Sequence, residues 1–196
     1  MAHGGERAGS ASTTYALGRA GGYLLRTKRT TGQRVRSAHT PGARYLAHTL
    51  AVGDLYVALV DADRGGTIQL ADFDPEPACW RHYPAPFGAQ QTLKPDAYLK
   101  LMTPEYELAW FIEIDMATEA LTTIKAKASR YHEYFRSGTE QAAHGVFPRV
   151  LWITPDTARA EAITETLARL PVEAHRLFAT TTADAAPGFL ASEARV

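Results

Sequence analysis

At 196 residues, with 45% hydrophobic and 21% charged residues, the chain has the composition of one globular domain rather than of a disordered protein. Its 21 basic and 21 acidic residues give a net charge of zero, which argues against a protein that coats nucleic acid without discrimination. No apolar run approaches the roughly 20 residues of a membrane helix, no apolar signal core follows the N-terminus, and the lone cysteine excludes an intrachain disulfide. These features predict a cytoplasmic protein without a membrane partner.

The first 40 residues are expected to form a flexible, basic N-terminal arm. Residues 1–13 are rich in Gly, Ala and Ser, and residues 14–38 favour a short hairpin. No acidic residue lies between Arg19 and Arg44. Such an arm suits phosphate contacts, although a solvated charged segment has the same composition. The candidate DNA-binding residues are Arg26, Lys28, Arg29, Arg34 and Arg36.

Residues 41–185 are expected to form the folded domain, followed by a C-terminal tail at 186–196. Apolar periodicity and β-branched runs predict, in chain order, a helix at 43–63, strands at 66–73, 97–102 and 107–115, a helix at 117–135, a strand at 148–154, a helix at 156–170 and a strand at 175–182. Thr118 is the expected N-cap of the second helix, and residues 75–86 read as a proline-rich loop. The order α-β-β-β-α-β-α-β predicts a mixed β-sheet flanked by helices, which is the order of the restriction-endonuclease-like α/β fold.

Three carboxylates lie at the ends of two of these strands. Side chains alternate along a strand, so Glu113 and Asp115 share a face, and pairing of the two strands would bring Asp96 near Glu113. Clustered carboxylates suit Mg²⁺ or Mn²⁺, and a bound ion would activate water for attack on a phosphodiester. A charge on Glu113 among large apolar neighbours is costly unless it is paired or binds a metal. The alternative is that these acids belong to solvated turns.

Four segments in order resemble the replication-relaxation family of plasmid and mobile-element proteins, over approximately residues 41–182. They are HTLAVGDLYVAL with His48 and Asp54, PDAYLKL, WFIEIDMATE with Lys127-x-x-x-Tyr131 on the next helix, and VLWITPDTARAEAI with Arg159. That family is similar to a branch of the PD-(D/E)XK nuclease superfamily. Its members usually have a winged-helix DNA-binding domain in front, for which this chain is too short.

The resemblance implies a DNA-processing protein of plasmid or mobile-element replication or transfer, with Asp96, Glu113 and Asp115 as metal ligands and catalytic residues. It also implies DNA as a partner, with other replication or transfer proteins and a second copy of the chain as further candidates. Two functions follow from it: a Mg²⁺- or Mn²⁺-dependent endonuclease or nickase, and a non-catalytic, relaxosome-type accessory protein. A third class, a protein–protein scaffold, would rest on exposed aromatic residues near Trp80 and Tyr83.

The superfamily pattern is Glu-x-Lys, whereas this chain has Glu113-Ile114-Asp115. A cationic amine is needed near the metal to orient water and stabilise negative charge. Lys127-x-x-x-Tyr131 is similar to a Gln-x-x-x-Tyr motif that lines the site of related nucleases, so Lys127 is the candidate catalytic lysine, supported by Tyr131. The alternatives are Lys100 as that lysine, and Lys127 as an ordinary amphipathic lysine paired with Asp115. His48 is either a supporting residue or a core or capping histidine.

Overall fold

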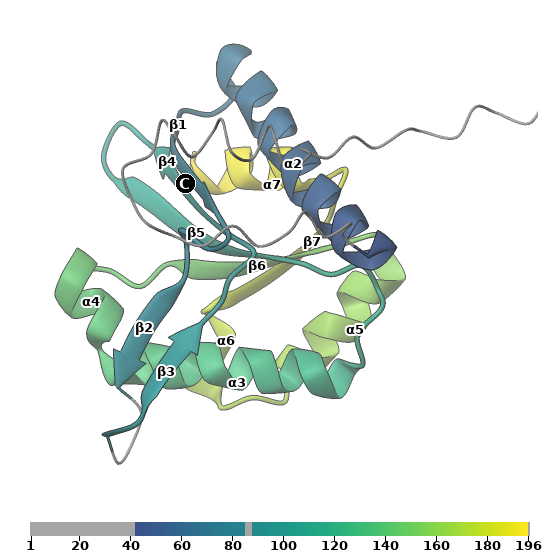
Figure 1. The fold of residues 1–196 in the computed structure, drawn as a ribbon. Coiled ribbons are helices and arrows are strands. Elements are labelled where there is room, and N and C mark those ends of the chain that lie inside the picture. Colours follow the sequence, from purple (N-terminus) through teal and green to yellow (C-terminus); the bar gives the residue numbers. More distant parts are fainter. Residues whose placement is uncertain (1–41, 85–87, 196) are drawn as a thin grey trace, which may run out of the picture. The chain divides into compact units, whose positions relative to one another are not determined.

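The computed structural model describes residues 42–84 and 88–195 (Figure 1). Contacts divide the chain into a unit that ends at Leu46 and a unit from Ala47 to Val196. The fold and the candidate site lie in the second unit. None of the helices in these described residues has the length and apolar character needed to cross a membrane.

Five strands form one mixed sheet in the order β1-β4-β5-β6-β7. Their bounds are β1 Leu70–Pro75, β4 Ala97–Met102, β5 Glu107–Ile114, β6 Arg149–Thr154 and β7 Phe178–Thr182. β1, β4 and β5 pair antiparallel, while β5, β6 and β7 pair parallel. β5 and β6 are the most apolar strands and lie inside the sheet, where both faces are covered. The predicted mixed α/β fold is confirmed.

Helices cover both faces of the sheet. α2 (Ala43–Arg64) and α7 (Ala186–Glu193) lie on one side, and α3 (Leu121–Ser137), α5 (Thr157–Leu167) and α6 (Val172–His175) lie on the other (Figure 1). Trp110 and Ile112 pack towards α2 and α7, while Phe111 packs towards α3. This alternation places the side chain of Glu113, two residues after Phe111, on the α3 side of the sheet.

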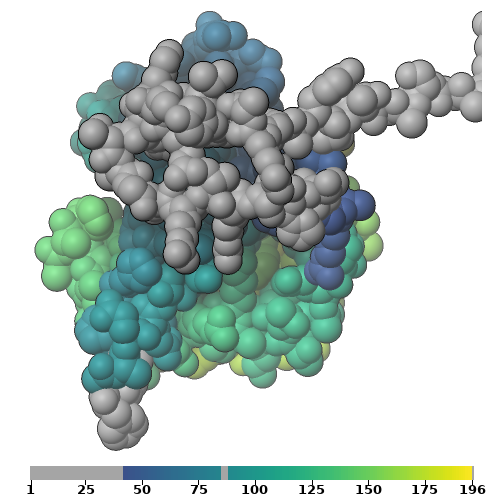
Figure 2. Space-filling model, viewed as in Figure 1, coloured from purple at the N-terminus to yellow at the C-terminus, as the bar shows by residue number. Residues whose placement is uncertain are grey.

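The segment predicted to be a proline-rich loop at 75–86 contains a strand. β2 (Arg81–Pro84) pairs antiparallel with β3 (Gln90–Leu93) in a separate two-stranded sheet. Tyr83 and Leu93 point inward and are buried, so the expected exposure of Tyr83 is wrong. Pro84 is the last residue of β2, at the end of the ladder, where a proline is tolerated. The β2–β3 pair lies beside α3 at the surface (Figure 2).

Several element ends differ from the sequence prediction. α3 begins at Leu121 with Ala120 as its N-cap and no side-chain cap, so Thr118 does not cap it. The backbone turns sharply before this helix, since Ala117 has a φ of 54°. β1 begins at Leu70 rather than residue 66, because the Gly65-Gly66 turn still closes α2, with the amide of Thr67 donating to Ala62.

In the described part of the chain, three helices were not predicted: α4 (Thr139–His144), α6 and α7. α6 ends at His175, the first residue of the segment assigned to the last strand, and the strand itself begins at Phe178. α7 lies in the segment assigned to a C-terminal tail, and its Ala186, Leu190 and Ala191 are buried against the sheet. The segment is short and its apolar residues show little helical periodicity, so the sequence gives weak evidence for a helix. Packing on the sheet stabilises it.

Candidate functional site

Asp96 and Glu113 face each other across the β4–β5 ladder. The pairing of Ala97 with Ile112 places Asp96 opposite Glu113 at the next position, and the amide of Asp96 donates to the carbonyl of Ile112 at 3.0 Å. The amide of Ile114 in turn donates to Oδ2 of Asp96 at 2.7 Å. The two acids therefore lie together at one end of the sheet, as their positions in the sequence predicted.

His48 on α2 contacts the same carboxylate oxygen of Asp96 that accepts from Ile114. Its Nε2 lies 3.1 Å from Oδ2 of Asp96, and its side chain is 29% exposed. The hydrogen bond to Asp96 raises the pKa of His48 despite the opposing effect of burial, and the charge of Glu76 adds to this rise. His48 thus supports Asp96 rather than filling the core.

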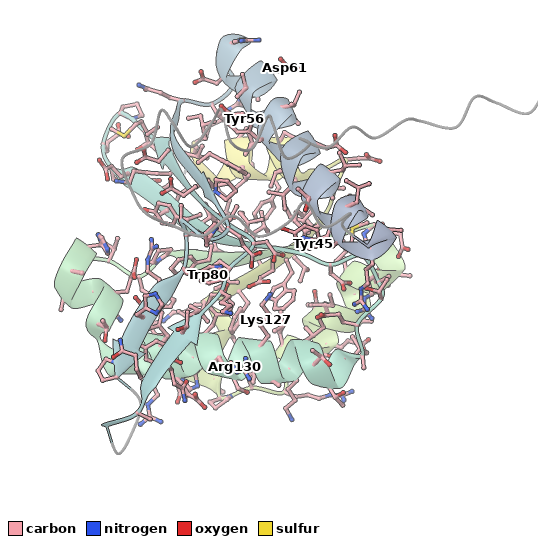
Figure 3. The ribbon with its side chains drawn as sticks, in the orientation of Figure 1. Tyr45, Tyr56, Asp61, Trp80, Lys127 and Arg130 are labelled. Atoms are coloured by element: carbon pink, nitrogen blue, oxygen red, sulfur yellow. The ribbon has the colours of Figure 1, made fainter. Side chains whose placement is uncertain are left out.

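Glu113 is buried and is held by two residues of α3. Only 1% of its surface is exposed, the ammonium of Lys127 contacts Oε2, and the hydroxyl of Tyr131 donates to Oε1 at 2.5 Å. Lys127 and Tyr131 are four residues apart, so both point from one face of α3 towards the strand (Lys127 is labelled in Figure 3). Lys127 therefore pairs with Glu113 and not with Asp115.

Burial and the neighbouring carboxylates together set the pKa values of Lys127 and Tyr131. Burial lowers the pKa of Lys127, but the carboxylates of Glu113 and Asp96 outweigh that effect and the net change is upward. Burial, followed by the charge of Glu113, raises the pKa of Tyr131 well above its usual value. Both groups consequently keep their protons at neutral pH. Lys127 is a fixed cation here, and Tyr131 is a hydrogen-bond donor.

Asp115 is held by an arginine from a more distant part of the chain. Arg159 Nε lies 2.5 Å from Oδ2 of Asp115 and Nη2 lies 3.2 Å from Oδ1, a bidentate geometry. Nη2 also donates to the carbonyl of Glu119 at 2.7 Å. Asp156 caps α5 and accepts from the amide of Arg159 at 2.8 Å, which fixes the first turn of that helix. Both oxygens of Asp115 are therefore already used.

Asp115 also lines a pocket of about 540 Å³ at the carboxyl ends of the parallel strands. The pocket walls come from α2, the ends of β5 and β6, and the β7–α7 connection. Most of this lining is apolar, with Asp54, Asp184 and Thr154 among its polar residues. The carboxyl edge of parallel strands is where open α/β sheets commonly bind ligands.

The remaining candidate residues lie elsewhere. Lys100, the alternative catalytic lysine, pairs with Glu107 at 2.9 Å and with Asp72 at 3.9 Å on the sheet surface. The candidate DNA-binding residues Arg26, Lys28, Arg29, Arg34 and Arg36 lie outside the described residues. Within residues 42–84 and 88–195, no three His, Cys, Asp or Glu side chains gather closely enough to hold a metal ion.

A second buried ion pair was not expected from the sequence. Glu140 on α4 is 1% exposed, and its carboxylate accepts from Arg81 Nε at 3.2 and 3.4 Å and from the hydroxyl of Tyr134. Arg81 also lies over the rings of Tyr98 and Phe111. This network joins β2 to α3 and α4, and it stabilises the part of the fold next to the site.

Burial makes Glu113 a pH-sensitive element of stability. It raises the pKa of Glu113 from 4.5 to about 8, against the opposing effect of Lys127. As pH rises from about 5 to about 8, the unfolded chain releases this proton before the folded chain does, so the contribution to stability falls by up to a few kcal/mol. Lys127 stays protonated in both states over this range.

We expect urea denaturation to show that the free energy of unfolding of wild type falls relative to that of Glu113→Gln as pH rises. A difference between the two proteins that stays constant with pH would contradict this expectation.

A family model for replication-relaxation proteins matches residues 2–150. The chain belongs to the replication-relaxation family. Membership connects it with DNA processing in plasmid replication or transfer, and with DNA as a partner. Comparisons with curated proteins and with solved structures find no match.

The family match differs in extent from the resemblance noted in the sequence. It begins at residue 2, well before residue 41, and therefore includes the basic segment. It ends at residue 150, inside β6, so Arg159 lies beyond it. Asp96, Glu113, Lys127 and Tyr131 are all within the part of this replication-relaxation protein that the family model matches.

Proposed function

We propose that this replication-relaxation protein is a divalent-metal-dependent DNA endonuclease or nickase, with a PD-(D/E)XK-type site, acting in plasmid or mobile-element replication or transfer. The observation that carries the proposal is the contact between Lys127 and Glu113. The sequence Glu113-Ile114-Asp115 lacks the lysine that such a site needs, and α3 supplies the partly buried ammonium of Lys127 at the same carboxylate.

The residues at the site have suitable chemistry for Mg²⁺ or Mn²⁺. Asp96 and Glu113 provide hard oxygen donors from adjacent strands, and ions of this kind are commonly held by one or two carboxylates with waters completing the shell. Lys127 would have to move away from Oε2 of Glu113 to admit the ion. We assign Asp115 to its ion pair with Arg159 rather than to the metal. A bound ion would lower the pKa of a water molecule and polarise the phosphodiester.

The chain's own residues have distinct roles in this proposal. Lys127 stays charged, so it would stabilise negative charge on the phosphate rather than accept a proton. Tyr131 donates to Glu113 and fixes the orientation of its carboxylate. His48 does the same for Asp96. Arg159 anchors the end of β5 through Asp115, and so keeps Glu113 in register with Asp96.

Cleavage of supercoiled plasmid with Mg²⁺ or Mn²⁺ tests this proposal. Wild type is expected to nick or linearise the plasmid, and Glu113→Gln to lower the rate at least about 100-fold, because it removes a negatively charged metal ligand. Glu107→Gln is the matched control, since Glu107 lies on the same strand but is exposed and pairs with Lys100. Absence of cleavage by wild type, or equal cleavage by Glu113→Gln, would refute the nuclease function.

A non-catalytic DNA-binding accessory protein is the second candidate. Each acid of the site already has a basic partner within the described residues: His48 with Asp96, Lys127 with Glu113, and Arg159 with Asp115. Paired acids of this kind hold a fold together without a metal. This candidate predicts the same DNA affinity in Mn²⁺ and in EDTA, with no cleavage in either, so the plasmid assay combined with a binding titration separates the two.

A further inference from the structure

The loop between β1 and β2 is attached to the segment that leads into Asp96. The amide of Glu76 donates to the carbonyl of Asp96 at 3.1 Å, and the buried thiol of Cys79 donates to the carbonyl of Pro95 at 3.0 Å. Trp80 follows directly, with its amide 3.3 Å from the carbonyl of Pro77. These contacts pack the loop that carries Trp80 against the backbone of Pro95 and Asp96 (Trp80 is labelled in Figure 3).

Trp80 differs from the other two tryptophans of the chain. Trp110 and Trp152 are buried at 0% and 2% exposure, whereas Trp80 is partly exposed. Its indole Nε1 donates weakly to Glu76 at 3.4 Å. A tryptophan that is only partly covered, in a loop packed next to a charged site, is suited to contact with a ligand rather than to core packing.

Lys94 lies over the ring of Trp80. Its Nζ is 4.2 Å from the ring centroid, and the side chain is exposed. An exposed cation–π contact of this kind is weak. A flat ligand could therefore displace the lysine from the ring at little cost, and the freed ammonium would then be available to a phosphate. An aromatic ring with an adjacent cation is how proteins commonly bind unpaired nucleotides.

We propose that Trp80 and Lys94 bind one unpaired nucleobase and its phosphate, so that the protein recognises single-stranded or locally unpaired DNA next to Asp96 and Glu113. The inference deepens the proposed DNA-processing function by naming its substrate class, and it does not depend on cleavage. In a duplex the base faces are stacked on one another, so Trp80 can stack only on a base that has left the helix.

Intrinsic fluorescence gives a direct test, because Trp80 is the most exposed of the three tryptophans. The full chain is titrated in EDTA with an unlabelled single strand, and separately with a duplex of the same sequence. We expect the single strand to quench the emission and the duplex to quench it much less. Trp80→Phe should abolish the quenching while keeping affinity for a labelled single strand within a few-fold, since phenylalanine still stacks. Quenching that persists in Trp80→Phe would overturn the proposal.

Salt dependence separates the roles of the two residues. Trp80→Leu should weaken single-strand binding about 5- to 100-fold without changing the dependence of affinity on salt, because stacking releases no counterions. Lys94→Gln should lower the slope of log affinity against log salt by about 0.7, the value for one lost phosphate contact. Tyr106→Leu is the control, since Tyr106 is an exposed aromatic in the β4–β5 turn.

The outcomes distinguish this inference from the proposed nuclease function. All measurements are made in EDTA, which removes divalent metal. Binding of the single strand can therefore be observed whether or not the protein cleaves DNA. Equal affinity of wild type and Trp80→Leu for the single strand, or an unchanged salt slope in Lys94→Gln, would overturn the inference. If Trp80→Leu does not fold, the Trp80→Phe quenching and the Lys94→Gln slope decide it alone.

Discussion

Replacing Lys127 with methionine is expected to lower the free energy of unfolding by about 3 kcal/mol. The substitution leaves Glu113, which is 1% exposed, as a buried carboxylate without its cation, and breaking a buried pair from one side costs about 3–5 kcal/mol. The lower end applies because the Lys127 side chain is itself 28% exposed. Urea denaturation at about pH 9, above the pKa of Glu113 in the folded chain, measures the loss, because the pair is ionised there. Lys125→Met, on the exposed face of the same helix, should change stability by no more than about 0.5 kcal/mol.

A double variant separates the structural role of Lys127 from its proposed catalytic role. Lys127→Met combined with Glu113→Gln removes both charges, so it should recover most of the lost stability. If Lys127 has only a structural role, DNA cleavage should remain measurable in Lys127→Met at a temperature where the variant is folded. The catalytic role predicts a fall in rate of at least about 100-fold in that variant. A stable Lys127→Met protein with full activity would contradict the assignment of Lys127.

Restoring the Glu-x-Lys pattern with Asp115→Lys is expected to destabilise the protein rather than to improve a nuclease site. Asp115 is 5% exposed and accepts two hydrogen bonds from Arg159. A lysine there would lose both bonds and place two positive charges together, at a cost of about 3–5 kcal/mol or more. The end of β5 would lose its anchor, so cleavage should fall as well.

Two comparisons make this result interpretable. Glu105→Lys makes the same charge change in an exposed turn and should be nearly neutral for stability. Asp115→Lys combined with Arg159→Glu exchanges the two charges and should recover part of the loss if the pair acts as we describe. A stable Asp115→Lys variant with higher cleavage activity would show that Asp115 stands in the place of the missing lysine and that α3 does not supply it.

The candidate site depended in part on tertiary contacts that no local pattern contains. Arg159 is 44 residues from Asp115 in the chain, and their contact exists only because α5 begins at the carboxyl end of β6, directly beside the end of β5. The pairing of Arg81 with Glu140 likewise joins a segment that looked like a proline-rich loop to a short helix that was not predicted. In both pairs the acid is buried and the arginine is partly exposed, yet in the sequence these four residues look like ordinary surface charges.

The periodicity of the sequence was enough to predict the central strands and the helix that carry the candidate site. Alternation along β4 and β5 placed Asp96 and Glu113 together, and the four-residue spacing on α3 aligned Lys127 with Tyr131, because strand and helix periods fix which side chains share a face. The sequence left open which acid Lys127 meets. The tertiary structure decided this: α3 packs on the face of β5 that carries Phe111 and Glu113, and Asp115, one residue beyond the strand, is reached by Arg159 instead. Periodicity specifies a face, whereas the partner on that face depends on how the elements pack.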